Sequence, residues 1–221
     1  HIARQVIVKN DAVVGWRAGT RHTFGVVIAA GTASNTCIIT PDGREWCYGY
    51  YAFDGGGVDI AKAGIDAVLR AEDGRGCATQ LTTPVLDHLG FATPDRLLRA
   101  MIAGSIAKEE IAMLCPLVFR AANNGDAVAA EILVKQGEYL AECATAVIRR
   151  FDMAQKTFDV VLAGSVFKGE GPLLIDTVTQ CVHRVAPQVS VVRAKLEPAV
   201  GAILLAYDAL EIPVSDRMMD N

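Results

Sequence analysis

Aromatic side chains and positive charge are both scarce in this 221-residue sequence. Only 6% of the residues are aromatic, and the formal net charge is -4. A nucleic-acid-binding surface normally combines a basic patch with stacking rings, so we expect no nucleic acid partner. The sequence also lacks an apolar run of the ~20 residues that cross a bilayer, and no signal peptide pattern opens it. These absences predict a cytoplasmic protein with no membrane partner.

Paired cysteines of the C-x-x-C type are missing as well. The six cysteines stand singly, and no histidine lies near them at a spacing that suits zinc; they are Cys37, Cys47, Cys77, Cys115, Cys143 and Cys181. We therefore expect buried, reduced thiols and no metal site. An initiating methionine is also absent, because the sequence opens at His1.

What is present is a regular succession of strand and helix patterns. Continuous apolar or β-branched runs predict strands, and apolar residues at helical spacing predict helices. The predicted order is strand 5–8, helix 12–18, antiparallel strands 23–30, 36–40 and 44–48, helix 58–69, an all-helical stretch 79–153, strand 158–163, helix 172–185, strand 189–192 and helix 198–210. Alternation of strands and helices in the last part indicates parallel crossovers.

From residue 23 onward this order resembles the ribonuclease H-like unit of the actin, Hsp70 and sugar-kinase superfamily. The resemblance implies an α/β lobe over residues 21–221, with a mixed five-stranded sheet and a helical insertion at about 75–155. Residues 1–20 would then be the last strand and helix of a first lobe that is otherwise missing. We expect residues 3–19 to pack separately from the rest for that reason.

Four short motifs each allow a functional and a structural interpretation. Asp11 follows a strand, where a carboxylate could accept a proton from a hydroxyl, or Asn10 and Asp11 could simply cap the next helix. Residues 31–34, Gly-Thr-Ala-Ser, could face phosphate oxygens or form a plain hairpin turn. Asp54, before three glycines, could bind a ligand or start a flexible loop. Gly164 and Ser165 could allow close approach of a nucleotide or form an ordinary strand-to-helix turn.

These motifs, in this order, resemble the N-acetylglucosamine kinases and the related BadF/BadG/BcrA/BcrD-type ATPases. Further segments that carry the likeness are 71–76, 161–166 and 198–202. The resemblance implies that Asp11 is the catalytic base, that ATP and Mg²⁺ are the cofactors, and that a sugar is the substrate. It implies that Gly31, Thr32 and Ser34 bind the phosphates, that Gly164 and Ser165 lie near the adenosine, and that the sugar contacts are Asn10, Cys47, Tyr48, Gly49 and Asp54.

Three segments depart from the family pattern. At 53–57, Gly55 stands where the family has a glutamate after the aspartate. Ala33 stands where the family has a second glycine, which matters if that position needs a positive φ. Trp-Cys-Tyr-Gly at 46–49 replaces Gly-Gly-Trp-Gly, so the sequence does not name the sugar.

The expected function is ATP-dependent phosphorylation of a sugar or amino sugar by a homodimeric enzyme, of which this chain is the C-terminal part. The Asp-Gly-Gly-Gly-Thr-type hairpin that holds Mg²⁺ and the outer phosphates in the family has no equivalent near its start. Two alternatives stay open: an ATPase that drives a partner protein, and a non-catalytic nucleotide- or sugar-binding module.

Overall fold

The computed structural model describes residues 6–49 and 54–214. Its strands are β1 (Gly25–Ala30), β2 (Ser34–Ile39), β3 (Glu45–Cys47), β4 (Asp159–Ala163) and β5 (Ser190–Arg193). Its helices are α1 (Asp11–Arg17), α2 (Gly57–Glu72), α3 (Thr82–Leu89), α4 (Pro94–Ile102), α5 (Lys108–Ala112), α6 (Cys115–Asn123), α7 (Ala127–Arg150), the 3-10 turn η1 (Ser165–Lys168), α8 (Leu173–His183) and α9 (Pro198–Ala209).

One mixed sheet organises the chain, with the strand order β3-β2-β1-β4-β5. Strands β1, β2 and β3 are antiparallel neighbours, whereas β4 lies parallel to both β1 and β5. Gly43 has a φ of +81° in the turn between β2 and β3, a conformation that glycine adopts without strain. The predicted α/β lobe with a mixed five-stranded sheet is thereby confirmed.

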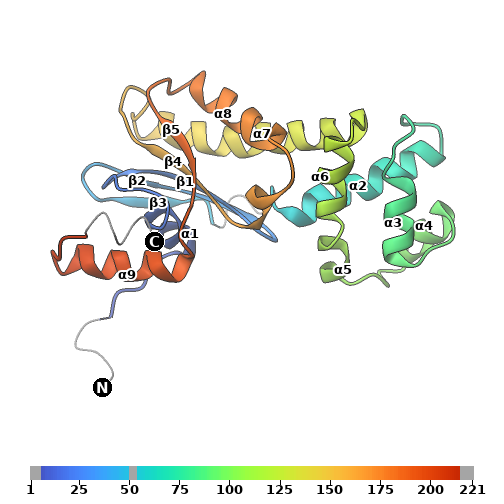
Figure 1. The fold of residues 1–221 in the computed structure, drawn as a ribbon, viewed down its shortest axis with the longest axis horizontal. Helices are drawn as coiled ribbons and strands as arrows, with labels where there is room; N and C mark the ends of the chain where they lie inside the picture. Colours follow the sequence, from blue (N-terminus) through green and yellow to red (C-terminus); the bar gives the residue numbers. More distant parts are fainter. Residues whose placement is uncertain (1–5, 50–53, 215–221) are drawn as a thin grey trace.

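Helices cover both faces of this sheet (Figure 1). Helices α7 and α8 lie over one face, and α1 and α9 lie over the other. Successive strand residues alternate between the two cores, as the pleat requires. Val26 and Ile28 belong to the larger core beneath α7, whereas Val27 belongs to the smaller core beneath α1.

Helix α1 is an integral part of the α1 and α9 layer. Its buried residues Val13 and Trp16 join the smaller core. Arg17 Nε lies 2.6 Å from Asp208 Oδ2 of α9, and a Cβ at Gly201 of α9 would lie 2.1 Å from the carbonyl oxygen of Val14. The expectation that residues 3–19 pack separately is therefore wrong, because the apolar face of α1 completes the second core.

The predicted strand at 5–8 is also not observed. Gln5 lies outside the described residues, and residues 6–10 form no regular structure. Val6 and Val8 are 78% and 88% exposed, and Ile7 is 48% exposed. β-Branched residues alone do not make a strand where no neighbouring strand offers hydrogen bonds.

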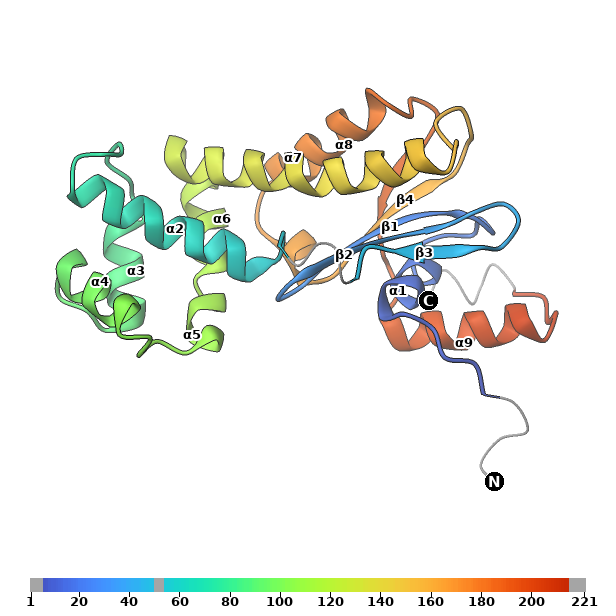
Figure 2. The same ribbon diagram turned by 180° about the vertical axis from the view of Figure 1, so that it is seen from behind.

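The all-helical insertion is confirmed: α3 to α6 project beyond one end of the sheet, and α7 runs back over it (Figure 2). Its longest helix, α7, begins after Asp126, whose carboxylate accepts hydrogen bonds from the Ala129 and Gln80 amides and the Thr79 hydroxyl. Burial opposes ionisation, but these hydrogen bonds hold the pKa of the Asp126 carboxyl below its usual range. No helix in the described ranges is long and apolar enough to cross a membrane.

The cysteines provide the third correction. Cys37 and Cys47 face each other across β2 and β3 and form a disulfide, with Cα atoms 4.0 Å apart. Cys77 is exposed and Cys143 and Cys181 are half-buried, so the expectation of buried, reduced thiols holds for Cys115 and is wrong for the other five. A hairpin centred on Asp42 pairs residue 37 with residue 47, so the predicted turn contained the signal for this bond.

Candidate nucleotide and substrate site

The carboxyl ends of the parallel strands gather the predicted site residues at one edge of the sheet. Helix α1 runs antiparallel to β4: Gly15 lies beside Ala163 at the end of the strand, and the Thr20 hydroxyl bonds Asp159 at its start. The amino end of α1 therefore lies at the edge where β1 and β4 end. In open α/β sheets this edge is where ligands bind.

Asn10 and Asp11 occupy different positions at the start of α1. Asn10 is the N-cap, and its Oδ1 accepts a hydrogen bond of 2.9 Å from the Ala12 amide. Asp11 is the first helical residue, is exposed, and accepts from the same amide through Oδ1 at 2.8 Å. Because Asn10 caps the helix, the Asp11 carboxylate keeps its second oxygen for a ligand.

The loop at residues 31–34 is fixed on the amino end of α2. The carbonyl of Gly31 accepts a hydrogen bond from the Gly57 amide at 2.7 Å, and that of Thr32 accepts one from Val58 at 3.3 Å. A Cβ at Gly56 would lie 2.2 Å from the Thr32 carbonyl oxygen, so only glycine permits this approach. Among the described residues, Asp152 and Glu211 are the non-glycine positions with positive φ. The alanine that replaces the family's second glycine therefore needs no special backbone conformation.

Gly164 brings the end of β4 against the end of β1. Its φ is +104°, and a Cβ there would lie 2.3 Å from the Ala30 carbonyl oxygen. Ser165 follows as an exposed residue at the start of η1. The structure therefore places Gly164 and Ser165 beside residues 30–32, as expected of two loops that share a ligand.

A cavity of about 290 Å³ opens between these loops and the helical insertion. Gly31, Thr32 and Ser165 line it, together with residues that the sequence did not single out, among them Cys115, Phe119 and Lys168. Burial raises the pKa of the Cys115 thiol to about 11. The cavity thus has one wall of loop backbone and hydroxyl groups and another of mainly apolar side chains with the charged Lys168 and Glu170, which suits a phosphate joined to a flat ring.

The predicted sugar contacts form a second group beside Asn10. The side chain of Asn35 makes both connections: its Nδ2 donates to Asn10 Oδ1 at 3.2 Å, and its Oδ1 accepts from the Gly49 backbone amide at 3.0 Å. Asn35 was not predicted, yet it joins the amino end of α1 to the segment after β3. The exposed Asp54 is held through its backbone carbonyl, which accepts a hydrogen bond from Ser34 Oγ.

Two of the predicted sugar contacts have their side chains engaged elsewhere. Cys47 is committed to the disulfide with Cys37. Tyr48 packs edge to face on Trp46 with ring centroids 4.8 Å apart, and burial raises the pKa of its hydroxyl. Trp46 in turn lies under the guanidinium of Arg150 from α7. At Cys47 only the backbone is left to face a ligand, whereas the half-buried Tyr48 has its ring held against Trp46.

A mixed sheet with glycine-containing loops and an exposed aspartate at its carboxyl edge defines a lobe of the actin-like ATPase type. The chain belongs to the BadF/BadG/BcrA/BcrD ATPase family, which it matches over residues 1–206. Curated relatives include an N-acetylmuramic acid/N-acetylglucosamine kinase from Clostridium acetobutylicum, which is 28% identical over 91% of this chain and 67% of its own length. An N-acetyl-D-glucosamine kinase from Dictyostelium discoideum is also 28% identical, over 91% of this chain and 65% of the relative.

Solved structures agree with this assignment. A candidate N-acetylglucosamine kinase from Chromobacterium violaceum superposes with a TM-score of 0.67 at 25% identity, over 88% of this chain and 64% of the other. A ROK family glucokinase from Streptomyces griseus, solved with glucose and AMPPNP, shares the fold with a TM-score of 0.51 at 19% identity, over 88% of this chain and 65% of its own. The chain therefore spans about two thirds of the length of these relatives.

Proposed function

We propose that the protein containing this chain transfers the γ-phosphoryl group of ATP to a hydroxyl of a sugar or amino sugar. The observation that carries the proposal is the convergence of Asp11, residues 31–32 and Gly164–Ser165 on one sheet edge beside a cavity of about 290 Å³. Family membership supports ATP as cofactor, and the kinases among the relatives support N-acetylglucosamine and N-acetylmuramic acid as the first substrates to try.

Each residue has a role that follows from its position. Asp11 accepts the proton of the attacking hydroxyl, because its carboxylate is exposed at the edge that both ligands share. Thr32, Ser34 and the backbone of Gly31 contact the phosphates, and Gly164 and Ser165 lie along the nucleoside. Ser34 positions Asp54 through its carbonyl, so that the Asp54 carboxylate accepts sugar hydroxyls with Asn10 and the Gly49 backbone beside it.

Magnesium enters this proposal with the nucleotide. Within residues 6–49 and 54–214, no group of three histidine, cysteine or acidic side chains is arranged to hold a metal ion. Mg²⁺ commonly uses one or two carboxylates, water and substrate phosphates instead of a complete protein cage, and we assign the protein's carboxylate to the Asp-Gly-Gly-Gly-Thr-type hairpin of the first lobe, not to this chain. When bound, the ion neutralises charge on the transferred phosphoryl group.

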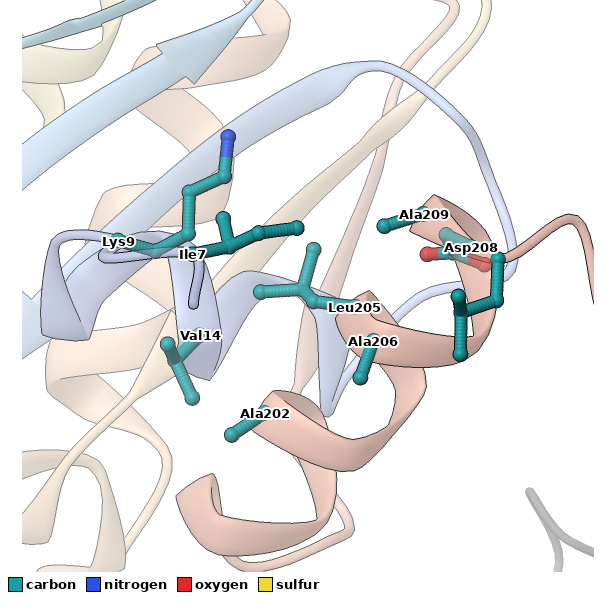
Figure 3. Close-up of a pocket in the computed structure, with 9 residues that line it drawn as sticks. Ile7, Lys9, Val14, Ala202, Leu205, Ala206, Asp208 and Ala209 are labelled. Atoms are coloured by element: carbon teal, nitrogen blue, oxygen red, sulfur yellow. The ribbon is translucent and has the colours of Figure 1, made fainter. Parts of the chain in front are cut away.

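The proposal also covers the organisation of the longer protein. Because α1 packs into the second lobe, residues 11–221 are assigned to that lobe, and the segment before α1 is assigned as the connection to a first lobe. An apolar groove of about 450 Å³ lies between α9 and the segment around Ile7, and Ile7 and Leu205 point toward each other there (Figure 3). The length that the relatives have beyond the matched region supports the first lobe as the occupant of this groove.

The proposal also includes a homodimer and a cytoplasmic location. Light scattering tests the first, and cell fractionation tests the second.

Replacement of Asp11 by asparagine in the longer protein tests the catalytic assignment. Asn keeps one oxygen for the Ala12 amide, so folding should persist, while loss of a general base lowers turnover by ~10²–10⁴-fold. ATP affinity should stay nearly the same. Asp87→Asn, at an exposed carboxylate of α3, is the control. Comparable turnover of Asp11→Asn and the control would reject Asp11 as the base, and ATP hydrolysis without any effect of sugar would favour an ATPase that acts on a partner protein.

A further inference from the structure

A second cavity, of about 210 Å³, adjoins the nucleotide cavity and has a different character. It lies where β4 and β5 end, on the side of the sheet that α1 covers, since Gly15 of α1 lines it. Its lining includes three cationic side chains, Lys168, Arg193 and Lys195, against the single carboxylate of Glu197. Ser165 and Lys168 line both cavities, so the two share a wall.

The positive charge in this second cavity is only partly neutralised. Lys168 Nζ lies 3.9 Å from Glu197 Oε1, and both side chains are exposed. Within the described part of the chain, neither Arg193 nor Lys195 makes an ion pair or a side-chain hydrogen bond. Two unpaired cations thus line one small cavity in a chain whose net charge is -4.

The volume of this second cavity and the charge of its lining indicate which kind of ligand it would bind. The volume is below the roughly 300–1,000 Å³ of pockets for drug-sized ligands, so the cavity suits a small group rather than a second nucleotide. Arginine matches a phosphoryl group with paired donors, lysine adds a point charge, and the Ser165 hydroxyl adds a further donor. We propose that the cavity binds the phosphoryl group of a phosphate monoester at a site separate from the nucleotide.

The position of this site connects it to the reaction. Gly15 lies about one helical turn after Asp11, so a phosphoryl group held here is close to the proposed base. The common wall at Ser165 and Lys168 couples the two cavities, and the coupling is reciprocal: a bound monoester changes nucleotide affinity by the same factor as the nucleotide changes monoester affinity. The binding of a phosphoryl group in this cavity is independent of the proposed function. Only the identification of its source as a sugar phosphate formed by the enzyme rests on that function.

Calorimetric titration of inorganic phosphate into the 221-residue chain, without sugar or nucleotide, tests the site directly. We expect one binding site, with affinity reduced by about tenfold or more in Arg193→Gln combined with Lys195→Gln. The matched control combines Arg184→Gln with Lys156→Gln, two exposed cations at the opposite edge of the sheet. A hexose monophosphate titrated in parallel distinguishes the sources: tighter binding than phosphate identifies the sugar phosphate, and equal binding identifies phosphate itself.

Three results would overturn the inference. They are absence of phosphate binding, an equal loss of affinity in the control pair, and a parallel loss of ATP affinity in the Arg193 and Lys195 pair, which would assign both cations to the nucleotide. Failure of the sugar-kinase proposal leaves this titration unchanged, because neither sugar nor ATP is present in it.

Discussion

Gly56 is the residue on which the position of the proposed phosphate loop depends most. In Gly56→Ala, the new Cβ would lie 2.2 Å from the Thr32 carbonyl oxygen and 2.4 Å from the Ala33 Cα, so backbone must move. We expect a loss of about 1–3 kcal/mol in the free energy of unfolding, measured by urea denaturation, and weaker ATP binding. Gly31→Ala is the control, because its Cβ would meet nothing within 4 Å. Equal stability of the two variants would show that the loop does not rest on α2 in this way.

The buried thiol of Cys115, in the nucleotide cavity, should make the stability of the chain and the reactivity of this cysteine depend on pH. Burial raises the pKa of its thiol to about 11 from 9.0, so the folded state favours the protonated thiol. The resulting contribution to stability is present below the unfolded pKa and is lost as pH rises from about 9 toward about 11. At about pH 8 the thiolate, which is the reactive form, should therefore be scarce.

Alkylation with N-ethylmaleimide followed by peptide mass spectrometry measures this reactivity. Exposed Cys77 serves as the internal reference and should react much faster than Cys115. The Cys115 rate should increase with pH up to about 11, and saturating ATP should lower it. Labelling of Cys115 as fast as Cys77 near neutral pH would contradict the burial of this side chain.

At the scale of secondary-structure elements, apolar periodicity and turn residues were sufficient to predict those helices and strands that depend on local sequence. The pattern predicted a helix over 58–69, and α2 spans Gly57–Glu72 there. The residues around Val8 show the limit, because a β-branched run becomes a strand only beside a partner. The geometry of the site was predictable only in part. The predicted strand order brings Asp11, Thr32 and Gly164 to one edge of the sheet. The role of Asn35 was not predictable, because it depends on the contact of β2 and the segment after β3 with the start of α1.

The disulfide between β2 and β3 gives the clearest prediction at this scale. β3 has three residues and pairs only with β2 among the described strands, so the bond between Cys37 and Cys47 is a principal restraint on it. Closing this short loop restricts the unfolded chain, a stabilisation of about 3 kcal/mol in the chain-entropy description. Reduction should lower the free energy of unfolding by about that amount, measured by urea denaturation with and without reductant.

The double variant Cys37→Ala with Cys47→Ala should no longer respond to reductant, whereas Cys77→Ala should respond as the unaltered chain does. Thiol counting on the unfolded, unreduced protein checks the premise. Six reactive thiols would show that the bond does not form, and reductant would then have no effect on stability.

At the scale of the whole molecule, α9 carries an exposed apolar side chain that the proposed first lobe would cover. Ile203 of α9 is 52% exposed in the 221-residue chain. Ile203→Asp should leave the stability of this chain nearly unchanged and should lower that of the longer protein, by ~1–3 kcal/mol, because a charge would then be buried against the first lobe. Ile102→Asp, at a 77% exposed position of α4, is the control. Equal melting temperatures of the two variants in the longer protein would remove the first lobe from this face.

The central claim is that the residues gathered at the carboxyl edge of the sheet serve phosphoryl transfer to a sugar. Phosphorus NMR of the longer protein with ATP, Mg²⁺ and a panel of hexoses and N-acetylated amino sugars tests it most directly. We predict a new phosphate monoester signal that grows in step with ADP, requires one class of sugar, and is lost in Asp11→Asn. Release of inorganic phosphate at the same rate with and without every sugar, or a monoester formed equally well by Asp11→Asn, would contradict the claim.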